Sequence, residues 1–447
     1  MFTLKRPHRQ TLATVALVVL TIVPTVYVAI TAWRINRPAH VRAVESELGR
    51  QLGLRVTLEA VRHPRPGEDA FRNVILRQEE LHGKQATEVA RADDVRVLRN
   101  GHNLTLEVAG LRLSGESPKQ AMAQVGALLQ RVGDGLYRRV NLTARECEIE
   151  LGQGGGSGAP ALFLFRDVVG TFDASPTAPT LTVSYRVPGE GSSTRCELSL
   201  TRDRQGPAVR TTLVFKSMDG LPLPARVLDP FFDTNNWLGR SARAEGSLTL
   251  RQTGTSEWEA EFQGTLHDVD LAALVDRQFR DHRLTGLARI RITQARWAER
   301  PGGQGVGWVN AEGELSAGPG SIGIGLVKAL KSEMKFRFPT ALESRATDLP
   351  YHSLGLTFAM TPDGELRLGG GLGSEYPPDA VLVDANHFAP LASAPEGTAN
   401  VRGLVRTLFP TSAADRETLV PDTAESRVLH YLPAPITAAK RRDILTN

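Results

Sequence analysis

Apolar and polar residues alternate along much of the chain with a period of two, which is typical of β-strands with one buried and one solvated face. In the most regular stretch, 257–266, glutamate, glutamine and threonine alternate with Trp258, Ala260, Phe262, Gly264 and Leu266. The same alternation predicts further strands at 181–187, 195–201, 247–251, 288–293, 334–338 and 354–368, the last of which contains a Pro-Asp-Gly turn.

This strand pattern excludes a doubly wound parallel sheet, because strands covered on both faces read as continuous apolar runs. The predicted fold class is therefore mainly β, with an antiparallel sheet. In a sandwich or small barrel the apolar faces would cover each other. In a single bent sheet they would line an open groove, which needs an apolar occupant. The alternation is compatible with both arrangements.

A few isolated helices are predicted among the strands. Pro38 stands at a first helical position, apolar residues follow at 41, 44, 48 and 52, and Gly53 ends the run. We expect this helix to cap the sheet. A second helix is predicted over 118–136 with Ser117 as its N-cap, and a short third helix follows Asp270.

Residues 11–33 form an uncharged stretch of 23 residues. As a helix it would be about 35 Å long, against about 30 Å of bilayer hydrocarbon. It exceeds the apolar core of a cleaved signal and no A-x-A site follows, so we predict an uncleaved anchor in which Pro24 introduces a kink. Basic residues flank both ends of the stretch, so they do not decide which end lies in the cytoplasm. We infer that the short segment before the stretch is cytoplasmic and that the long segment after it lies across the membrane, as in a signal anchor.

These observations divide the chain into four parts. Residues 1–10 are a cytoplasmic head, 11–33 the transmembrane helix, 34–374 an elongated β-rich domain and 375–447 a tail. The tail loses the alternation and is rich in Pro, Ala, Thr and Asp, so we expect it to be irregular or partly disordered.

Composition narrows the function classes. The 447 residues exceed what one compact core holds, so the chain must be split or elongated. The 53 basic and 49 acidic residues nearly cancel and are scattered, which does not indicate a nucleic-acid partner. Two cysteines and ten unclustered histidines do not indicate a disulfide framework, a metal site or any cofactor. Cys147 and Cys196 are expected to be small buried side chains, and whether they pair is left open.

Motifs with catalytic associations are explained more simply. Residues 318–323 (GPGSIG) match a dinucleotide fingerprint, but the segment that follows is predicted to be a short apolar stretch and then a strand. Residues 332–335 match S-x-x-K, but at the start of a predicted strand. His267, Asp268 and Asp270 suit a turn and a helix cap better than a metal site. We therefore predict no catalytic residues and no enzyme.

The layout resembles the bacterial AsmA-like family. The resemblance rests on a basic head, one membrane span, and the segments RPAHVRAVESELGRQLGLRVTLEAV, GRSARAEGSLTLR, FQGTLHDVDLAALVDRQFRDHRLTGLARIRI and LGLTFAMTPDGELRLGG, and it covers residues 11–373. It implies an inner-membrane protein with a periplasmic, elongated and curved sheet (a β-groove) that has an apolar inner surface and is related to bridge-like lipid-transfer proteins.

The resulting hypothesis is a non-enzymatic, membrane-anchored protein that binds or guides lipids in envelope lipid transport or outer-membrane biogenesis. The acyl chains would contact the apolar strand faces, at Leu248, Leu250, Trp258, Phe262, Leu266, Ile290, Ile292, Phe336, Phe338, Leu356 and Phe358. The alternative is an anchored scaffold with a closed β core, in which the same side chains are buried and envelope proteins or polysaccharide are the partners.

Overall fold

The chain is mainly β. The computed structural model describes residues 14–27, 37–78, 87–115, 137–151, 161–188, 193–218, 221–225, 238–254, 257–275, 281–299, 306–339, 348–386 and 390–408. Across these ranges, 22 strands form one sheet in which nearly all neighbours are antiparallel. The expectation of a mainly antiparallel β fold with few helices is confirmed.

The strands are numbered along the chain. Their bounds are β1 (Arg55–Thr57), β2 (Ala60–Arg65), β3 (Glu68–Gln78), β4 (Thr87–Asn100), β5 (Asn103–Ala109), β6 (Leu111–Gly115), β7 (Arg139–Leu151), β8 (Ala161–Asp173), β9 (Thr180–Pro188), β10 (Ser193–Asp203), β11 (Arg210–Ser217), β12 (Leu223–Pro224), β13 (Arg243–Thr253), β14 (Glu257–Asp270), β15 (Leu287–Glu299), β16 (Val306–Ala317), β17 (Gly320–Ile322), β18 (Leu349–Met360), β19 (Glu365–Gly370), β20 (Ala380–Asp384), β21 (Pro390–Ser393) and β22 (Thr398–Asn400). The helices are α3 (Pro38–Leu52), α5 (Leu271–Leu274), α6 (Ile324–Met334) and α7 (Val401–Leu408), with a π-helical turn η1 (Val18–Ile22).

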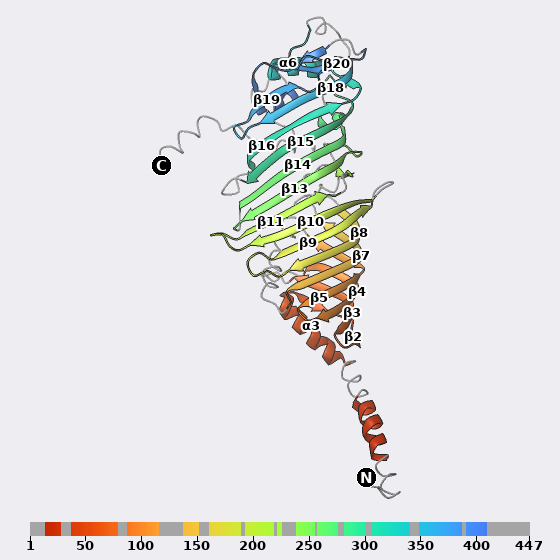
Figure 1. Cartoon of the computed structure of the whole chain (residues 1–447). Coiled ribbons are helices and arrows are strands. Elements are labelled where there is room, and N and C mark those ends of the chain that lie inside the picture. The colour runs from red at the N-terminus through yellow and green to blue at the C-terminus, as the bar shows by residue number, and fades with distance from the viewer. Residues whose placement is uncertain are drawn as a thin grey trace.

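The strands follow one another as rungs of a long ribbon, since most pair with their neighbours in sequence (Figure 1). The parallel pairings in the described sheet are those of β5 and β6 with β7. A parallel pair requires a crossover connection. Residues 116–136, over which the second helix was predicted, form this connection and lie outside the described residues.

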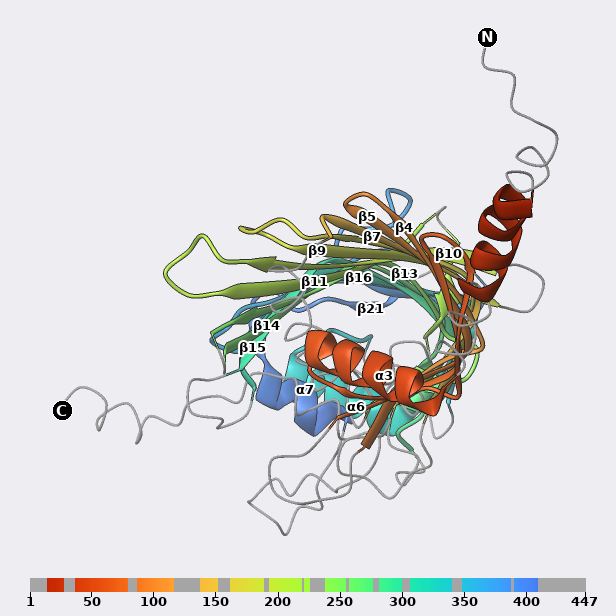
Figure 2. The ribbon, with the colours of Figure 1, turned by 90° about the horizontal axis from the view of Figure 1, so that it is seen from below.

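The ribbon is curved across its width, and the helices lie on its concave side (Figure 2). Helix α3 covers the N-terminal end of this concave face, while α6 and α7 pack together at the C-terminal end (Figure 1). The concave face is therefore covered by helix at both ends of the ribbon.

The helix signals predicted from sequence are confirmed at two places. Pro38 occupies the first turn of α3, and Gly53 ends that helix in the left-handed conformation with φ 64°. The apolar face of α3 packs on the buried residues of the first hairpin, among them Val56, Val61 and Phe71. Asp270 caps α5 by accepting a hydrogen bond from the backbone N–H of Ala272 at 3.0 Å.

Within the segment 11–33, residues 14–27 are described and are helical, and the rest lies outside the described residues. The turn η1 immediately precedes the turn that contains Pro24, and such a π-helical turn accommodates the missing N–H of a proline. Among the described residues, no helix is both long and apolar enough to cross a bilayer. The membrane anchor stays a prediction.

Two predicted elements differ from the structure. The strand predicted at 334–338 is wrong, because α6 continues to Met334 and the following residues form only an isolated bridge at Arg337. The apolar residues at 326, 327, 330 and 334 fit one helix face as well as Met334, Phe336 and Phe338 fit a strand. The predicted irregular tail also begins too early, because β20, β21, β22 and α7 all belong to the folded C-terminal end.

Cys147 and Cys196 are both buried and both free. They lie on β7 and β10, with β8 and β9 between them in the sheet. At about 4.8 Å per strand they are about 14 Å apart, whereas disulfide-bonded Cα atoms lie within about 7 Å. Burial raises the pKa of Cys147 to about 11 and that of Cys196 to about 12. The two cysteines are therefore inert packing residues that cannot pair.

Candidate functional site

One row of directly opposed residues runs across the sheet without a single polar side chain. It crosses β4, β5, β7, β8, β9, β10, β11, β13, β14, β15, β16, β18, β19 and β22. At about 4.8 Å per strand the row is about 60 Å long. Its members, hereafter the apolar row, are Val97, Leu106, Leu142, Gly170, Val183, Leu198, Phe215, Leu248, Phe262, Ala295, Ala311, Met360, Leu366 and Ala399.

The neighbouring row, made of the adjacent residue on each strand, is polar except for Val214. From β5 to β16 it reads Thr105, Asn141, Thr171, Thr182, Ser199, Val214, Thr249, Glu261, Arg296 and Asn310. Cross-strand ion pairs lie on this face, including Arg251 with Glu261 at 3.0 Å and Arg296 with Glu259. Because adjacent residues of a strand point to opposite faces, the sheet has one oily face and one wet face.

The apolar row lies on the concave face. At its N-terminal end Val97 and Leu106 pack in the same cluster as residues of α3. At its C-terminal end Met360 and Leu366 pack with residues of α6 and α7. Both sets of helices lie on the concave side in Figure 2. The helices therefore cover the two ends of the row.

Between these caps the row is more accessible. From β5 to β16, its members are half-buried except Gly170, which is buried, and Leu248, which is 2% exposed. Leu248 is buried because it packs in a hydrophobic cluster with Leu238, which precedes β13, Val269 at the end of β14 and Leu271 of α5. The apolar row itself therefore remains partly accessible to solvent in the middle of the concave face. The parallel row two residues away is more deeply buried, at Phe172, Leu200, Leu213 and Ala260.

The structure brings most of the residues predicted from sequence onto this face. Leu248 and Phe262 belong to the apolar row itself, and a parallel row is formed by Leu266, Ile290, Leu315 and Leu356. Half-buried positions on the same face are Leu250, Phe262, Ile290, Ile292, Leu356 and Phe358. The strand prediction placed these residues correctly because it used only the period of two.

Other predicted residues do not line an accessible surface. Leu248 and Leu266 are buried, as parts of the core over the middle of the sheet. Phe336 is buried among Met334 and Met360 in the C-terminal cap, and Phe338 packs there beside it, since neither residue is in a strand. The side chain of Trp258 lies outside the described residues.

Sequence reasoning missed the N-terminal half of this face. Half-buried apolar residues there are Phe163, Val183, Leu198 and Phe215, which pack around buried Phe165 and Tyr185. The alternation at 181–187 and 195–201 signalled two of these strands. Choosing lining residues from the later strands alone was the error.

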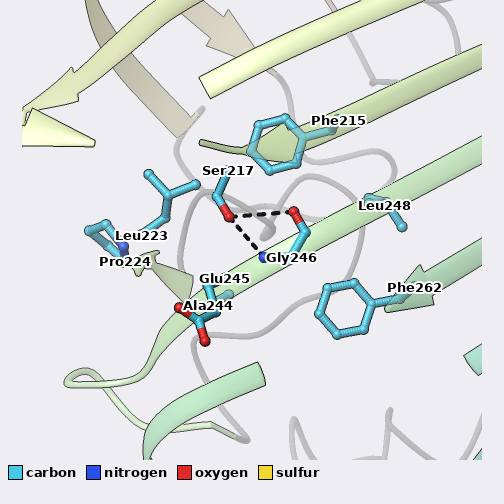
Figure 3. Close-up of a pocket in the computed structure, with 9 residues that line it drawn as sticks. All are labelled: Phe215, Ser217, Leu223, Pro224, Ala244, Glu245, Gly246, Leu248 and Phe262. Atoms are coloured by element: carbon cyan, nitrogen blue, oxygen red, sulfur yellow. Dashed lines mark hydrogen bonds between the residues drawn. The ribbon is translucent and has the colours of Figure 1, made fainter. Parts of the chain in front are cut away.

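A small cavity opens on the apolar face where β11 ends and β12 begins (Figure 3). Its volume is about 10 Å³, and the side chains of Phe215, Leu248 and Phe262 surround it. The pairing of β11 with β13 ends at Lys216 and Ser247 beside this cavity. There the hydroxyl of Ser217 accepts a hydrogen bond from the backbone N–H of Gly246 at 2.8 Å. A cavity of this size has room for about one water, so it is a packing gap and not a ligand pocket.

A larger hollow of about 540 Å³ lies mainly on the wet face, over β15, β16, β18 and β19. Its charged lining consists of Arg291, Glu312, Glu314 and Arg367, and Arg291 faces Glu314 at 3.5 Å. Two bases and two acids leave no net charge to select an anion or a cation.

The glycine-rich motif at 318–323 has a structural explanation. Contrary to the sequence expectation, β17 leads directly into α6 there. However, a Cβ on Gly320 would lie 1.9 Å from the carbonyl oxygen of Thr285, and one on Gly323 would lie 2.3 Å from that of Asp281. The backbone of 281–285 therefore occupies the space beside these glycines that a phosphate would need.

The S-x-x-K match at 332–335 lies at the end of α6 rather than at the start of a strand. Lys335 donates a hydrogen bond through Nζ to the carbonyl oxygen of Ser332 at 2.7 Å, and the Ser332 hydroxyl donates to Ala329. Both contacts satisfy carbonyl groups at a helix C-terminus.

Comparison of the chain with known protein families, with characterised proteins and with solved structures finds no match.

Proposed function

We propose that this chain is a membrane-anchored, AsmA-like protein that binds lipids by their acyl chains along the concave face of its sheet. In this proposal it is not an enzyme, residues 11–33 anchor it in the inner membrane, and most of the chain lies in the periplasm. Its role is the transport of lipids, or their handling in outer-membrane biogenesis. The AsmA-like resemblance is part of the proposal.

The apolar row is the observation that supports lipid binding most directly. Apolar surface exposed to water costs about 25 cal/mol per Å². A row of about 60 Å whose middle is half-buried is unfavourable in water unless something apolar covers it. Acyl chains lying along the row would bury these side chains, and their headgroups would remain in solvent.

The described part of the predicted anchor supports attachment to a membrane. Large apolar side chains are exposed over more than half of the circumference of the helix at 14–27, with Val15 at 55%, Leu17 at 64% and Leu20 at 75%. The remaining side carries Thr21 and Thr25, whose hydroxyls donate hydrogen bonds to backbone carbonyls one turn earlier. A helix with exposed apolar side chains and no charge on any side is typical of a lipid environment rather than of a protein surface.

The scaffold with a closed β core receives less support. A closed core needs a second sheet or a barrel to cover the apolar faces. The strands of the described residues all belong to one sheet, and its concave face is covered by helices at its ends.

The experiment is lipid extraction from the full chain, purified in a mild detergent, followed by mass spectrometry. We expect acyl lipids to co-purify with the wild-type chain. Replacing Leu250 by asparagine places a polar group on the half-buried oily face and should reduce the lipid retained per chain several-fold, because an amide buried against acyl chains lacks hydrogen-bond partners.

Thr249→Asn is the matched control, since Thr249 is the adjacent residue on the wet face. It should retain the wild-type amount of lipid. A wild-type chain with no more lipid than a detergent blank, or equal lipid loss in both variants, would contradict the proposal.

A further inference from the structure

A buried tyrosine on the oily face leaves its hydroxyl without a protein partner. Tyr185 lies on β9, two residues and about 7 Å along the strand from Val183 of the apolar row, and it is 9% exposed. Its ring packs edge-on against Phe165, with ring centroids 4.6 Å apart, and the residue directly opposite on β10 is buried Cys196. The ring of Tyr185 is therefore held firmly within the hydrophobic cluster of the N-terminal half of this face.

The hydroxyl of Tyr185 differs from that of the other buried tyrosine in the described ranges. Tyr351, which is 1% exposed, donates its hydroxyl to the backbone carbonyl of Thr285 at 2.5 Å. The hydroxyl of Tyr185 bonds to no protein group in the described part of the chain, and it is not one of the fully covered polar atoms there. Tyrosine hydroxyls usually find a partner when the ring is buried. The oxygen of Tyr185 therefore reaches accessible space, where its partner must come from outside the protein.

The chemistry of this hydroxyl restricts that partner. Burial raises the pKa of Tyr185 well above its ordinary value, and Cys196 acts in the same direction, so the phenol keeps its proton at physiological pH. It can donate one hydrogen bond. The surrounding side chains are apolar, so bringing a charged acceptor among them would be costly. An uncharged carbonyl oxygen fits the hydroxyl best, and in an acyl lipid the ester carbonyl lies where the chain joins the headgroup.

We propose that Tyr185 donates a hydrogen bond to the ester carbonyl of a lipid whose acyl chain lies on the apolar row, and so makes this face selective for ester-linked lipids. The inference rests on the proposed function, because without acyl binding the hydroxyl meets only water. A polar group placed on an otherwise apolar binding surface fixes the orientation of a ligand. A hydrogen-bond donor also discriminates against an analogue that lacks the acceptor, which apolar contacts along the row cannot do.

The test compares a diester phosphatidylglycerol with its diether analogue, which has the same chains and headgroup but no carbonyl. Each lipid competes with a fluorescent acyl lipid for the purified full chain in mixed detergent micelles. We expect the wild-type chain to bind the diester about fivefold more tightly, as one neutral hydrogen bond implies. Tyr185→Phe removes only the hydroxyl and should bind both lipids with the affinity that the wild-type chain has for the diether.

Tyr351→Phe is the matched control, because it removes a phenol hydroxyl from the cluster around α6. It should keep the fivefold preference for the diester. Thermal unfolding of the lipid-free chains gives a second readout. Tyr351→Phe should unfold at a lower temperature because it loses the bond to Thr285, whereas Tyr185→Phe should be as stable as wild type because its hydroxyl bonds to no protein group described here.

The outcomes separate this inference from the proposed function. Equal binding of the two lipids by the wild-type chain would overturn the role of Tyr185 and leave acyl binding intact. A preference for the diester that persists in Tyr185→Phe would overturn it in the same way. Binding of neither lipid would overturn the proposed function and this inference together.

Discussion

Replacing Gly320 by alanine is expected to lower the free energy of unfolding by about 3 kcal/mol, because the added methyl group overlaps atoms that cannot move away. The new Cβ would lie 1.9 Å from the carbonyl oxygen of Thr285 and 2.7 Å from the hydroxyl oxygen of Tyr351. These two atoms are themselves hydrogen-bonded, with Tyr351 donating at 2.5 Å. Relief of the overlap must therefore break this bond or separate β17 from the backbone of 283–285.

Hydrogen exchange of the full chain followed by mass spectrometry is the measurement. Peptides that cover 281–288, 319–330 and 349–354 should exchange faster in the variant. Gly318→Ala is the matched control, because a Cβ at Gly318 meets no atom within 4 Å. Its effect should stay within about 0.5 kcal/mol. Equal protection in the two variants would mean that the glycine-rich motif is not explained by close packing.

Replacing Leu248 by alanine is expected to cost about 3 kcal/mol of stability, within the range for a fully buried leucine. Leu248 is 2% exposed and lies directly between Phe215 and Phe262 in the register of the sheet. It also borders the existing cavity of about 10 Å³, so truncation would enlarge a void that its rigid aromatic neighbours cannot fill.

The comparison with Leu250→Ala separates buried from accessible positions on the same strand and face. Leu250 is half-buried, so its truncation should cost about 1 kcal/mol or less. Urea denaturation monitored by tryptophan fluorescence gives both values. A cost for Leu250→Ala as large as that for Leu248→Ala would indicate that the middle of the concave face is a closed core.

The period of two predicted the fold class and the oily strand faces because each strand alternates by itself, without reference to its neighbours. Leu250, Phe262 and Ile290 were placed on one face for this reason. The continuity of the apolar row depends instead on register, which is set by the turns and bulges between strands. No single strand contains that information.

The predictions that the structure contradicts also failed because they used the pattern within a single segment. Phe336 and Phe338 alternate, yet the preceding helix and the isolated bridge at Arg337 place them in a cap. The segment after 375 was predicted to be irregular, since β20, β21 and β22 are too short to show a period.

The most direct test of acyl-chain binding is photo-crosslinking in intact cells. The photoreactive residue p-benzoylphenylalanine is placed at Phe262 on the apolar row, or at the adjacent exposed Gln263 on the wet face. Because the two positions share one strand, they differ only in the face that they report. The account predicts crosslinks to acyl lipids from position 262 and none from position 263. Crosslinks from position 262 to the chain's own residues alone, or equal lipid crosslinking from both positions, would contradict it.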